Sequence, residues 1–187
     1  RSVAFADVNG DGKLDLPAAN SSDGSLSVLL GNGNGTFQAQ QTFAVAVHPE
    51  SIAVGDVNGD GNADVVFGSS NTSTVSVVLG NGEGAFQGPA QFAAGNVPLS
   101  VALGDLNGDG KLDLVTATQA DNSITVLKGN GLGGFTLAGT VPAGPGPVAV
   151  AAGDFNGDGR PDLVVANNGN LSNPGNTVTV LFGTGTG

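Results

Sequence analysis

The sequence predicts an all-β fold of four 49-residue repeats, each with four antiparallel strands, in which the last repeat lacks its fourth strand. The first supporting observation is an acidic pattern, D-x-N-G-D-G-x-x-D, whose copies are 49 residues apart and begin at Asp7, Asp56, Asp105 and Asp154. Short runs rich in Val, Leu and Ile flank every copy, as expected for strands. Gly, Ser and Asn interrupt these runs within a few residues, so no helix of useful length fits.

Each repeat opens with an apolar strand, expected at residues 2–6, 52–55, 101–104 and 150–153. Large and small apolar residues alternate in it, which predicts a strand buried on both faces between two other sheets. The acidic loop follows, and a second strand begins near residues 16, 65, 114 and 163. Pro17 occupies a position where the other repeats have Val. Because proline cannot donate a hydrogen bond to a central ladder, we expect the first repeat to be irregular there.

The third strand is expected at residues 26–30, 75–79, 124–127 and 178–182, and a longer connection at 168–176 is predicted to be a surface loop. A Gly-rich turn then ends in a Phe that we expect to anchor packing, at Phe37, Phe86 and Phe135. The fourth strand contains Phe43, Phe92 and Val141 and is expected to end near Pro49, Pro98 and Pro147. The fourth repeat reaches Gly187 before this strand, which predicts an unpaired edge completed by sequence cut away or by a neighbouring molecule.

The acidic loop has the ligand chemistry of a hard cation. Carboxylate or amide oxygens occupy positions 1, 3, 5 and 9, and position 7 offers its backbone carbonyl, as in the first nine positions of an EF-hand calcium loop. No thiolate or imidazole is present, which disfavours zinc and copper, and magnesium demands a stricter octahedron. We therefore expect about four Ca²⁺ ions, one per loop. The expected ligands are Asp7, Asn9, Asp11, Lys13, Asp15; Asp56, Asn58, Asp60, Asn62, Asp64; Asp105, Asn107, Asp109, Lys111, Asp113; and Asp154, Asn156, Asp158, Arg160, Asp162.

Charge supports this interpretation. The four loops contain 12 of the 16 acidic residues, and four Ca²⁺ ions would change the formal charge from −11 to −3. Two carboxylates about 4 Å apart repel by roughly 4 kcal/mol at an effective dielectric of about 20. The simpler alternative, hairpin turns with solvated aspartates, is disfavoured by four copies at one period. A helical EF-hand is also disfavoured, because position 12 lacks the bidentate Glu and instead has Ala18, Phe67, Thr116 and Val165.

The composition sets broad limits on location and partners. The 187 residues fit a single repeat domain, 1–187, with units at approximately 1–49, 50–98, 99–147 and 148–187. Only five Lys and Arg residues argue against nucleic acid, and no apolar run matches a membrane span. The start at Arg1 without a signal peptide indicates a mature or excised piece. Extracellular calcium would fill weak sites, so we expect a secreted or cell-surface protein. The low-charge composition, rich in Ser, Thr, Asn and Gly, is compatible with a bacterial one.

These four-stranded units, with an acidic loop between strands and a Gly-rich turn ending in Phe, resemble the FG-GAP/VCBS repeats. Such repeats are the blades of the integrin-α-type β-propeller. The resemblance implies β-propeller-type blades, a calcium ion in each loop and a role in extracellular adhesion, ligand binding or assembly. The usual ring of this family has seven blades, whereas this chain has just under four. It would therefore close as a small ring, form part of a larger ring, or have its blades completed by another copy.

The predicted function is a non-catalytic, calcium-stabilised extracellular structural or adhesion module that self-assembles into a filament through its incomplete blade. Its expected partners are other copies of itself or a surface protein or glycan. The alternatives are a lectin-like propeller binding carbohydrate or protein, which the absence of Trp and Tyr disfavours, and a fragment of a seven-bladed propeller. Catalysis is not expected, because the acid–base residues outside the loops form no nucleophile–base constellation: Asp23, His48, Glu50, Glu83 and Asp121.

Overall fold

The chain folds into four antiparallel β-sheets that follow one another along the sequence. The computed structural model describes residues 2–45, 48–169 and 175–186. Within those residues the one helical segment is a single 3₁₀ turn, η1 (Gln119–Asp121), so the all-β prediction is confirmed and an EF-hand pair of helices is absent. No helix in the described part of the chain is long and apolar enough to span a membrane.

Three sheets have four strands and the fourth sheet has three, as the sequence predicts. The first sheet contains β1 (Ser2–Val3), β2 (Leu16–Asn20), β3 (Ser25–Leu29) and β4 (Gln41–Ala44), and the second contains β5 (Pro49–Gly55), β6 (Asp64–Ser69), β7 (Thr74–Val78) and β8 (Ala90–Ala93). The third contains β9 (Pro98–Gly104), β10 (Asp113–Thr118), β11 (Ser123–Gly129) and β12 (Phe135–Pro142). The fourth contains β13 (Pro147–Gly153), β14 (Asp162–Asn167) and β15 (Thr177–Leu181). Within each sheet the strands lie in chain order, which is the arrangement of a propeller blade.

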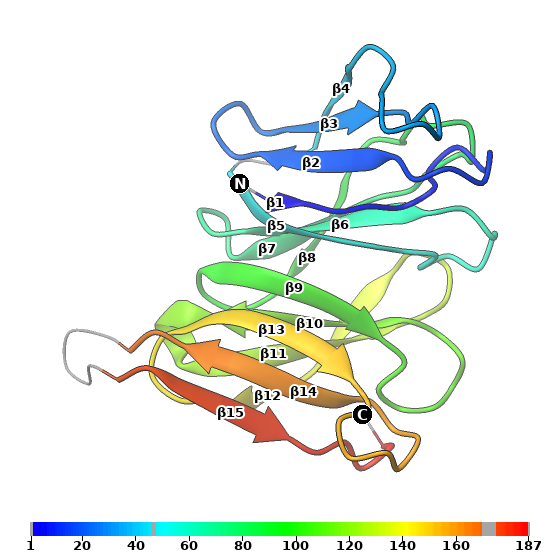
Figure 1. Cartoon of the computed structure of the whole chain (residues 1–187). Coiled ribbons are helices and arrows are strands. Elements are labelled where there is room, and N and C mark those ends of the chain that lie inside the picture. Colours follow the sequence, from blue (N-terminus) through cyan, green and yellow to red (C-terminus); the bar gives the residue numbers. More distant parts are fainter. Residues whose placement is uncertain (1, 46–47, 170–174, 187) are drawn as a thin grey trace.

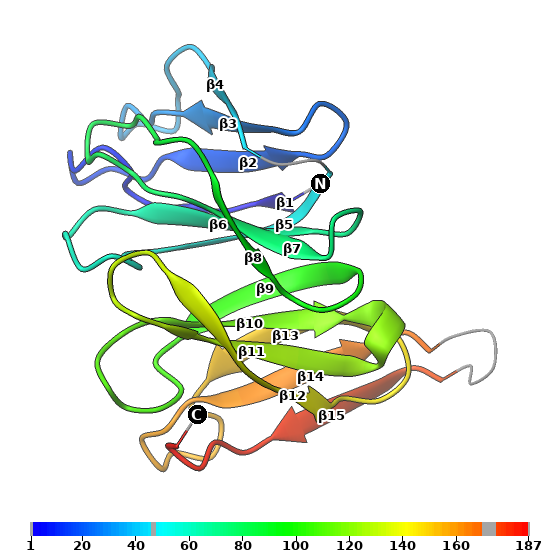
Figure 2. The ribbon, with the colours of Figure 1, turned by 180° about the vertical axis from the view of Figure 1, so that it is seen from behind.

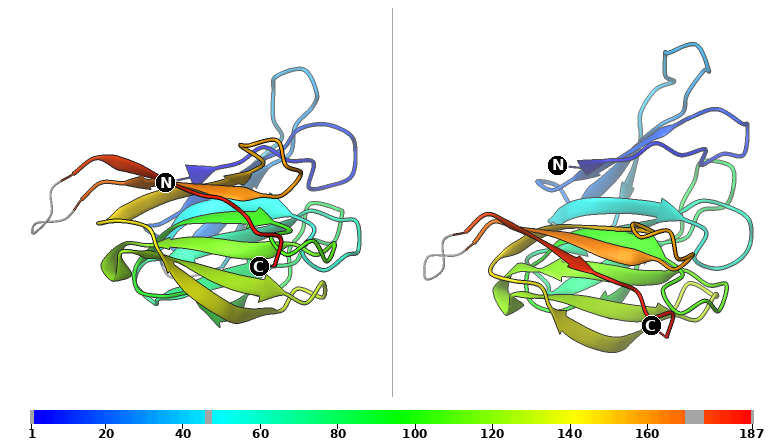
Figure 3. Two further views of the ribbon diagram at one scale, coloured as in Figure 1. Left: turned by 90° about the horizontal axis from the view of Figure 1, so that it is seen from below. Right: turned by 60° about the horizontal axis from the view of Figure 1, so that its bottom comes forward.

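The four blades are stacked in chain order, with the first and fourth blades at opposite ends of the stack (Figure 1). The first strands of successive blades are neighbours, so that β5 lies beside β1 and β9, and β9 lies beside β13. The outer strands β4, β8 and β12 are on the opposite side of the molecule (Figure 2). Seen from below, the sheet of β13, β14 and β15 is at the front (Figure 3). The described chain is thus an open stack rather than a closed ring.

An apolar core fills each of the three junctions between successive blades. At the first junction Val8, Leu26 and Val28 from the first blade pack with Val65 and Phe67 from the second. The second and third junctions use residues at the same repeat positions, shifted by one and two repeats. The regular 49-residue spacing therefore produces one packing pattern three times.

In the two middle blades the strand that is buried on both faces is the second, and the prediction that it would be the first is wrong. Every residue of β6 and β10 is buried, whereas most of β5 and β9 is half-buried. The reason is that a middle blade has another blade on each side, so both faces of its second strand are covered. The first strand lies at the inner margin of the stack. Neighbouring elements cover its alternating large and small side chains only in part.

The prediction that Pro49, Pro98 and Pro147 end the fourth strands is also wrong. Each of them is the first residue of the next blade's first strand, β5, β9 or β13. A proline is tolerated at this position because the first residue of a strand does not need to donate to the ladder. The third strands begin one residue earlier than expected in each repeat, for instance at Ser25 in β3.

The first blade is irregular where the sequence predicts it. The Pro17 carbonyl oxygen accepts a hydrogen bond from the Ala4 amide at 3.0 Å. In an antiparallel ladder the N–H and C=O of one residue point to the same neighbour, so the missing N–H of Pro17 also faces the first strand. That strand, β1, has two residues, whereas its counterpart β5 has seven.

Two of the three predicted Phe anchors are packed between blades. The Phe86 ring meets Phe43 edge-on with centroids 5.5 Å apart, and Phe135 meets Phe92 at 5.7 Å. Phe37 is different, since it is 39% exposed on the first blade. Its expected anchoring role is not fulfilled within the chain, because no described blade lies on that side of it.

At the third junction an apolar cavity of about 240 Å³ lies between the third and fourth blades. Leu106, Val141, Leu163 and Leu181 contribute to its lining. The predicted surface loop at 168–176 lies nearby in the sequence, but its residues 170–174 are outside the described part of the chain.

Candidate metal centre

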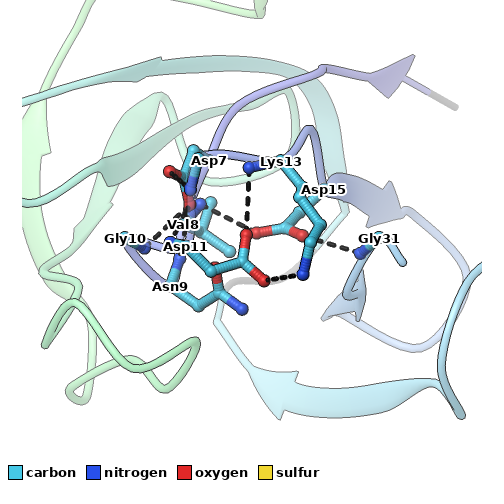
Figure 4. Close-up of polar contacts among 9 residues, drawn as sticks. Asp7, Val8, Asn9, Gly10, Asp11, Lys13, Asp15 and Gly31 are labelled. Atoms are coloured by element: carbon cyan, nitrogen blue, oxygen red, sulfur yellow. Dashed lines mark hydrogen bonds and ion pairs between the residues drawn. The ribbon is translucent and has the colours of Figure 1, made fainter. Parts of the chain in front are cut away.

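The first aspartate of each acidic loop organises the turn. In the first loop Asp7 Oδ1 accepts the amide N–H of Gly10 at 2.7 Å and that of Asp11 at 3.2 Å (Figure 4). Its Oδ2 accepts the amide N–H of Gly12 at 2.7 Å. Gly12 has a φ of +78°, a left-handed conformation that favours glycine. Asp56, Asp105 and Asp154 accept the corresponding bonds in the other three loops.

Positions 3 and 5 add side-chain turns of the same kind. Asn9 Oδ1 accepts the Asp11 amide at 3.1 Å, and Asp11 Oδ1 accepts the Lys13 amide at 3.0 Å. Short polar side chains commonly bond the backbone two residues ahead in this way. The same two bonds recur in all four loops. As a result, oxygens from positions 1, 3 and 5 are brought together at the exposed rim of each loop.

The aspartate at position 9 lies in the interior and connects three parts of the blade. Asp15 is fully buried; its Oδ2 accepts the Val8 amide at 2.9 Å and its Oδ1 accepts the Gly31 amide at 2.7 Å (Figure 4). Asp64, Asp113 and Asp162 are buried in the same way and accept the equivalent pairs of amides. This carboxylate braces the start of the loop against the end of the third strand.

The glycine on the other side of this brace is a functional residue that the sequence interpretation missed. A Cβ at Gly31 would lie 2.1 Å from the Leu14 carbonyl oxygen, and Gly80, Gly129 and Gly183 are equally crowded. Any larger residue would therefore push the third strand away from the carboxylate. The signal was available in the sequence, because a glycine follows the third strand in all four repeats, even where the preceding connection is longer.

Burial and hydrogen bonding move the loop pKa values in opposite directions. Desolvation by burial raises the pKa of Asp64 and Asp113, although backbone hydrogen bonds to each carboxylate partly oppose the rise. At position 5, hydrogen bonds from Lys13 lower the pKa of Asp11, and the bond from Lys128 lowers that of Asp109. The bond from the Asn58 side chain lowers the pKa of Asp60. The surroundings of Asp11, Asp60 and Asp109 thus lower their pKa values and favour the ionised form, whereas burial of Asp64 and Asp113 disfavours it.

In every loop the second oxygen of the position-5 aspartate meets a positively charged or amide donor. Lys13 Nζ lies 3.0 Å from Asp11 Oδ2, and Lys128 Nζ lies 3.1 Å from Asp109 Oδ2. In the other two loops the side-chain amides of Asn58 and Asn156 take this place, at 2.9 Å and 3.1 Å. The rim therefore collects donors at the point where a cation would interact with this carboxylate.

The donor set of each rim suits a hard cation, since it consists of carboxylate and amide oxygens that keep lone pairs beyond those bonded to N–H groups. Of the expected ligands, the structure brings positions 1, 3 and 5 together and places position 9 behind them. Among the described residues, no three carboxylate, imidazole or thiolate side chains already converge as a metal cluster. Binding would require these oxygens to draw closer than they are here.

Each of the first two loops is also joined to the following blade. The Gly84 amide in the second blade donates to the Val8 carbonyl at 3.2 Å, and the Gly133 amide in the third blade donates to the Val57 carbonyl at 3.1 Å. The side chains of Val8 and Val57 are buried in the same junctions. The conformation of an acidic loop is therefore coupled to the packing of the next blade.

Of the acid–base residues outside the loops, Asp23 and His48 line one surface pocket of the first blade. His48 is exposed, with a φ of 52°, in the turn before β5. Asp23 accepts the Ser25 hydroxyl, and Asp121 accepts the backbone and side-chain amides of Asn96. The hydroxyl that meets Asp23 belongs to the buried Ser25, and these contacts hold turns.

A family model described as FG-GAP-like repeat matches the chain three times, at residues 7–67, 56–116 and 105–165. Each match runs from one acidic loop through the next to the following blade's second strand. Together the three cover most of the chain. A search of curated proteins finds no match.

Solved structures with the same fold include a lectin from Agrocybe aegerita, described as specifically recognising non-reducing terminal N-acetylglucosamine (24% identity, TM-score 0.59, 97% of this chain and 52% of that one). Another is BBS1N in complex with ARL6DN (14% identity, TM-score 0.62, 97% and 56%). A third is the V. cholerae biofilm matrix protein Bap1 (20% identity, TM-score 0.58, 96% and 26%). The chain spans about half the length of the first two. At these identities the likeness establishes the fold.

Proposed function

Because this chain belongs to the FG-GAP-like repeat family, we propose that it is a calcium-stabilised, non-catalytic adhesion or binding module that works outside the cell. Calcium would bind in the four acidic loops and hold the blades in register. The location would be secreted or at the cell surface, where calcium is abundant.

The observation that carries the proposal is the fourfold recurrence of the oxygen rim. In each loop the aspartates at positions 1 and 5 and the asparagine at position 3 accept the same backbone bonds, and the position-5 carboxylate has a further donor. Bound calcium would supply two positive charges that offset the repulsion among these carboxylates. The ligands would be the side chains at positions 1, 3 and 5 and the carbonyl at position 7. Position 9 would act mainly as the buried brace, with lone pairs left for the ion.

Calcium bound in a loop would stabilise more than the loop. Val8 is held at its amide by Asp15 and at its carbonyl by Gly84 of the next blade. Fixing the first loop would therefore also fix the junction with the second blade. At about 1 mM calcium and a dissociation constant of about 10 μM, each site would add roughly 2.7 kcal/mol to the free energy of unfolding. Several such sites together would rival the whole stability of an ordinary domain.

The family and the structural neighbours support a role in adhesion or binding. One neighbour is described as a lectin and another as a biofilm matrix protein, and neither description names a catalytic activity. Large apolar side chains that are exposed on the first and fourth blades, among them Phe5 and Phe182, also provide surface for a protein contact. These features favour a structural module over an enzyme.

The test is calcium titration by calorimetry together with thermal unfolding in calcium, in magnesium and in chelator. The loop variant carries Asn in place of Asp11, Asp60, Asp109 and Asp158, and the control is Glu83→Gln, which removes an exposed carboxylate outside the loops. We expect about four calcium ions per wild-type chain and a melting temperature that falls in chelator. The control should match wild type and the loop variant should lose both effects. A wild-type chain that takes up no calcium would refute the proposal.

A further inference from the structure

Seven of the nine asparagines that directly precede a glycine lie in two repeated settings, position 3 of the acidic loops and the start of the Gly-rich turns. An asparagine before glycine readily loses its side-chain amide, because no Cβ hinders the glycine nitrogen as it approaches the side-chain carbon. Whether this happens depends on what holds the two reacting groups. The loop set and the turn set are Asn9, Asn58, Asn107, Asn156; and Asn32, Asn81, Asn130.

In the acidic loops both reacting groups are already engaged. The glycine amide that follows each position-3 asparagine donates to the position-1 aspartate at 2.7–2.8 Å. The asparagine oxygen accepts the position-5 amide, and in three of the loops its NH₂ group also donates to a carboxylate. The glycine nitrogen therefore cannot turn toward the asparagine without breaking the hydrogen bonds of the loop.

The Gly-rich turn of the second blade leaves the nucleophile free and activates the carbonyl. Asn81 is exposed, and its Oδ1 accepts two backbone amides, that of Glu83 at 2.9 Å and that of Ala85 at 3.0 Å. The amide of Gly82, which would attack, donates no hydrogen bond within the described part of the chain. Two N–H groups on one carbonyl oxygen stabilise the negative charge that this oxygen acquires when its carbon is attacked.

The third blade repeats this arrangement. Asn130 is exposed, and its Oδ1 accepts the amides of Leu132 at 2.8 Å and Gly134 at 3.0 Å. The amide of Gly131 is likewise without an acceptor among the described residues. Both turns lie in middle blades, with another blade on each side.

We infer that Asn81 and Asn130 are deamidation sites of the folded chain, activated by the two backbone amides that hold each side-chain oxygen. The Gly82 nitrogen gives its proton to a solvent base and bonds to Asn81 Cγ. The Cγ–Nδ2 bond then breaks, and the nitrogen leaves as ammonia. Water opens the resulting succinimide at either carbonyl, which gives aspartate or isoaspartate. The reaction goes beyond the proposed function and requires no metal.

The first blade contains the same dipeptide without this activation. The backbone is alike, since the glycine after Asn32 has a φ of +78° and the glycine after Asn81 has +74°. However, the Thr36 amide donates to Asn34 Oδ1 at 3.0 Å, and the Asn32 NH₂ group donates to the Thr36 hydroxyl at 2.9 Å. The difference follows from two residues, because the first turn has Asn34 and Thr36 where the second has Glu83 and Ala85.

The modification would act on a blade junction. Isoaspartate carries an extra methylene in the main chain, between Asn81 and the glycine after it. Farther along the same turn, the Gly84 amide donates to the Val8 carbonyl of the first blade at 3.2 Å. A longer main chain would displace Gly84 from this partner, so slow deamidation would weaken the first junction.

The experiment follows each asparagine by mass spectrometry of pepsin peptides while the folded chain is kept at mildly alkaline pH. Asn81 and Asn130 should convert about tenfold faster than Asn32 and Asn58. The variant Glu83→Asn with Ala85→Thr gives the second turn the residues of the first and should slow Asn81 by about the same factor. Asn130 in the same molecules is the internal control and should keep its rate. The reverse variant, Asn34→Glu with Thr36→Ala, should accelerate Asn32.

Circular dichroism confirms that each variant is folded during the incubation. Rates that become similar at all four asparagines in urea would support the inference, since the paired amides exist only in the folded chain. A folded-state rate at Asn81 no higher than at Asn32 would overturn it. An Asn81 rate that the exchange of Glu83 and Ala85 leaves unchanged would overturn it as well, because the two amides would then have no effect on the reaction.

Discussion

The amide of Gly84 donates a hydrogen bond to the carbonyl oxygen of Val8 at 3.2 Å, across the junction between the first and second blades. The amide of Val8 donates in turn to Asp15, whose other oxygen accepts the amide of Gly31. A continuous set of bonds thus links the third strand of one blade, its acidic loop and the Gly-rich turn of the next blade. The stability of a junction and the state of a loop should therefore be measurable through each other.

Gly84→Ala should destabilise the chain more than Gly35→Ala. Both glycines have positive φ values, for which an alanine costs about 1–2 kcal/mol. At Gly84 the added methyl would also lie 3.1 Å from a Leu30 methyl carbon in the junction, whereas Gly35 has open space. Urea unfolding at concentrations where the chain is monomeric measures the difference. Equal losses at the two sites would show that the junction adjusts without cost.

Asp64→Asn should lower the melting temperature in calcium and in chelator alike. Asp64 is fully buried and accepts the Val57 and Gly80 amides, and an asparagine NH₂ group would face one of these donors. One buried donor left unsatisfied costs about 1–3 kcal/mol. For a chain of this size a loss of about 2 kcal/mol corresponds to roughly 4–8 °C.

Asp60→Asn in the same loop is the matched comparison. Asp60 is exposed at the rim, so its replacement should lower the melting temperature in calcium and have little effect in chelator. Differential scanning calorimetry measures the melting temperatures of both variants in both buffers. It distinguishes a carboxylate that stabilises the fold without calcium from one that acts only with calcium. If Asp64→Asn were harmless in chelator, the buried carboxylate would have no structural role of its own.

Lys128→Met should strengthen calcium binding at the third loop. The Lys128 ammonium is paired with the Asp109 carboxylate at 3.1 Å, and an incoming cation has to compete with it. An exposed pair of this kind is worth about 0.2–1 kcal/mol, so the affinity gain should be up to about fivefold. Calorimetric titration in a background with Asp11, Asp60 and Asp158 changed to Asn isolates the third loop. Lys128→Arg keeps the charge and should leave the affinity unchanged; the same gain in both variants would contradict the explanation.

Without calcium the chain should be most stable near pH 4. The lowered pKa values of Asp11, Asp60, Asp109 and Asp154 contribute stability that is present above the ordinary value of 3.8 and is lost as the pH falls through them. The raised pKa values of Asp64 and Asp113 contribute stability that is present below 3.8 and is lost as the pH rises through them. Without calcium, the free energy of unfolding should therefore decrease on both sides of this pH.

Urea unfolding in calcium-depleted buffers across the acid range measures this optimum. The double variant Asp64→Asn with Asp113→Asn removes the raised carboxyls and should flatten the decline above the optimum. A wild-type stability that keeps rising from weakly acid to neutral pH, with no calcium present, would be inconsistent with buried ionised carboxylates that destabilise the fold.

Much of the fold follows from the sequence, because one period imposes the same elements four times. The all-β class, the three-stranded fourth blade and the irregularity at Pro17 are confirmed. The wrong predictions concern relations between blades. Burial on both faces of β6 comes from the blades on either side, and the exposure of Phe37 comes from the lack of a described blade before it. Neither is encoded in the local alternation of residues.

The candidate site was predictable only in part. The spacing of acidic residues identified the loop, and the structure brings Asp7, Asn9 and Asp11 together at its rim. Sequence reasoning gave Asp15 the same role as these residues, although it lies in the interior with both oxygens bonded to amides. The sequence spacing does not distinguish a rim aspartate from a buried one, because the two differ only in which amides surround them.

The repetition of one junction has a consequence for how such a chain changes in evolution. Since every junction uses the same repeat positions, gain or loss of a whole 49-residue unit leaves each remaining junction with equivalent contacts. Recombination between the similar repeats can therefore lengthen or shorten the stack in steps of one blade without a new interface having to arise. The number of blades is then free to vary while the two end faces are retained.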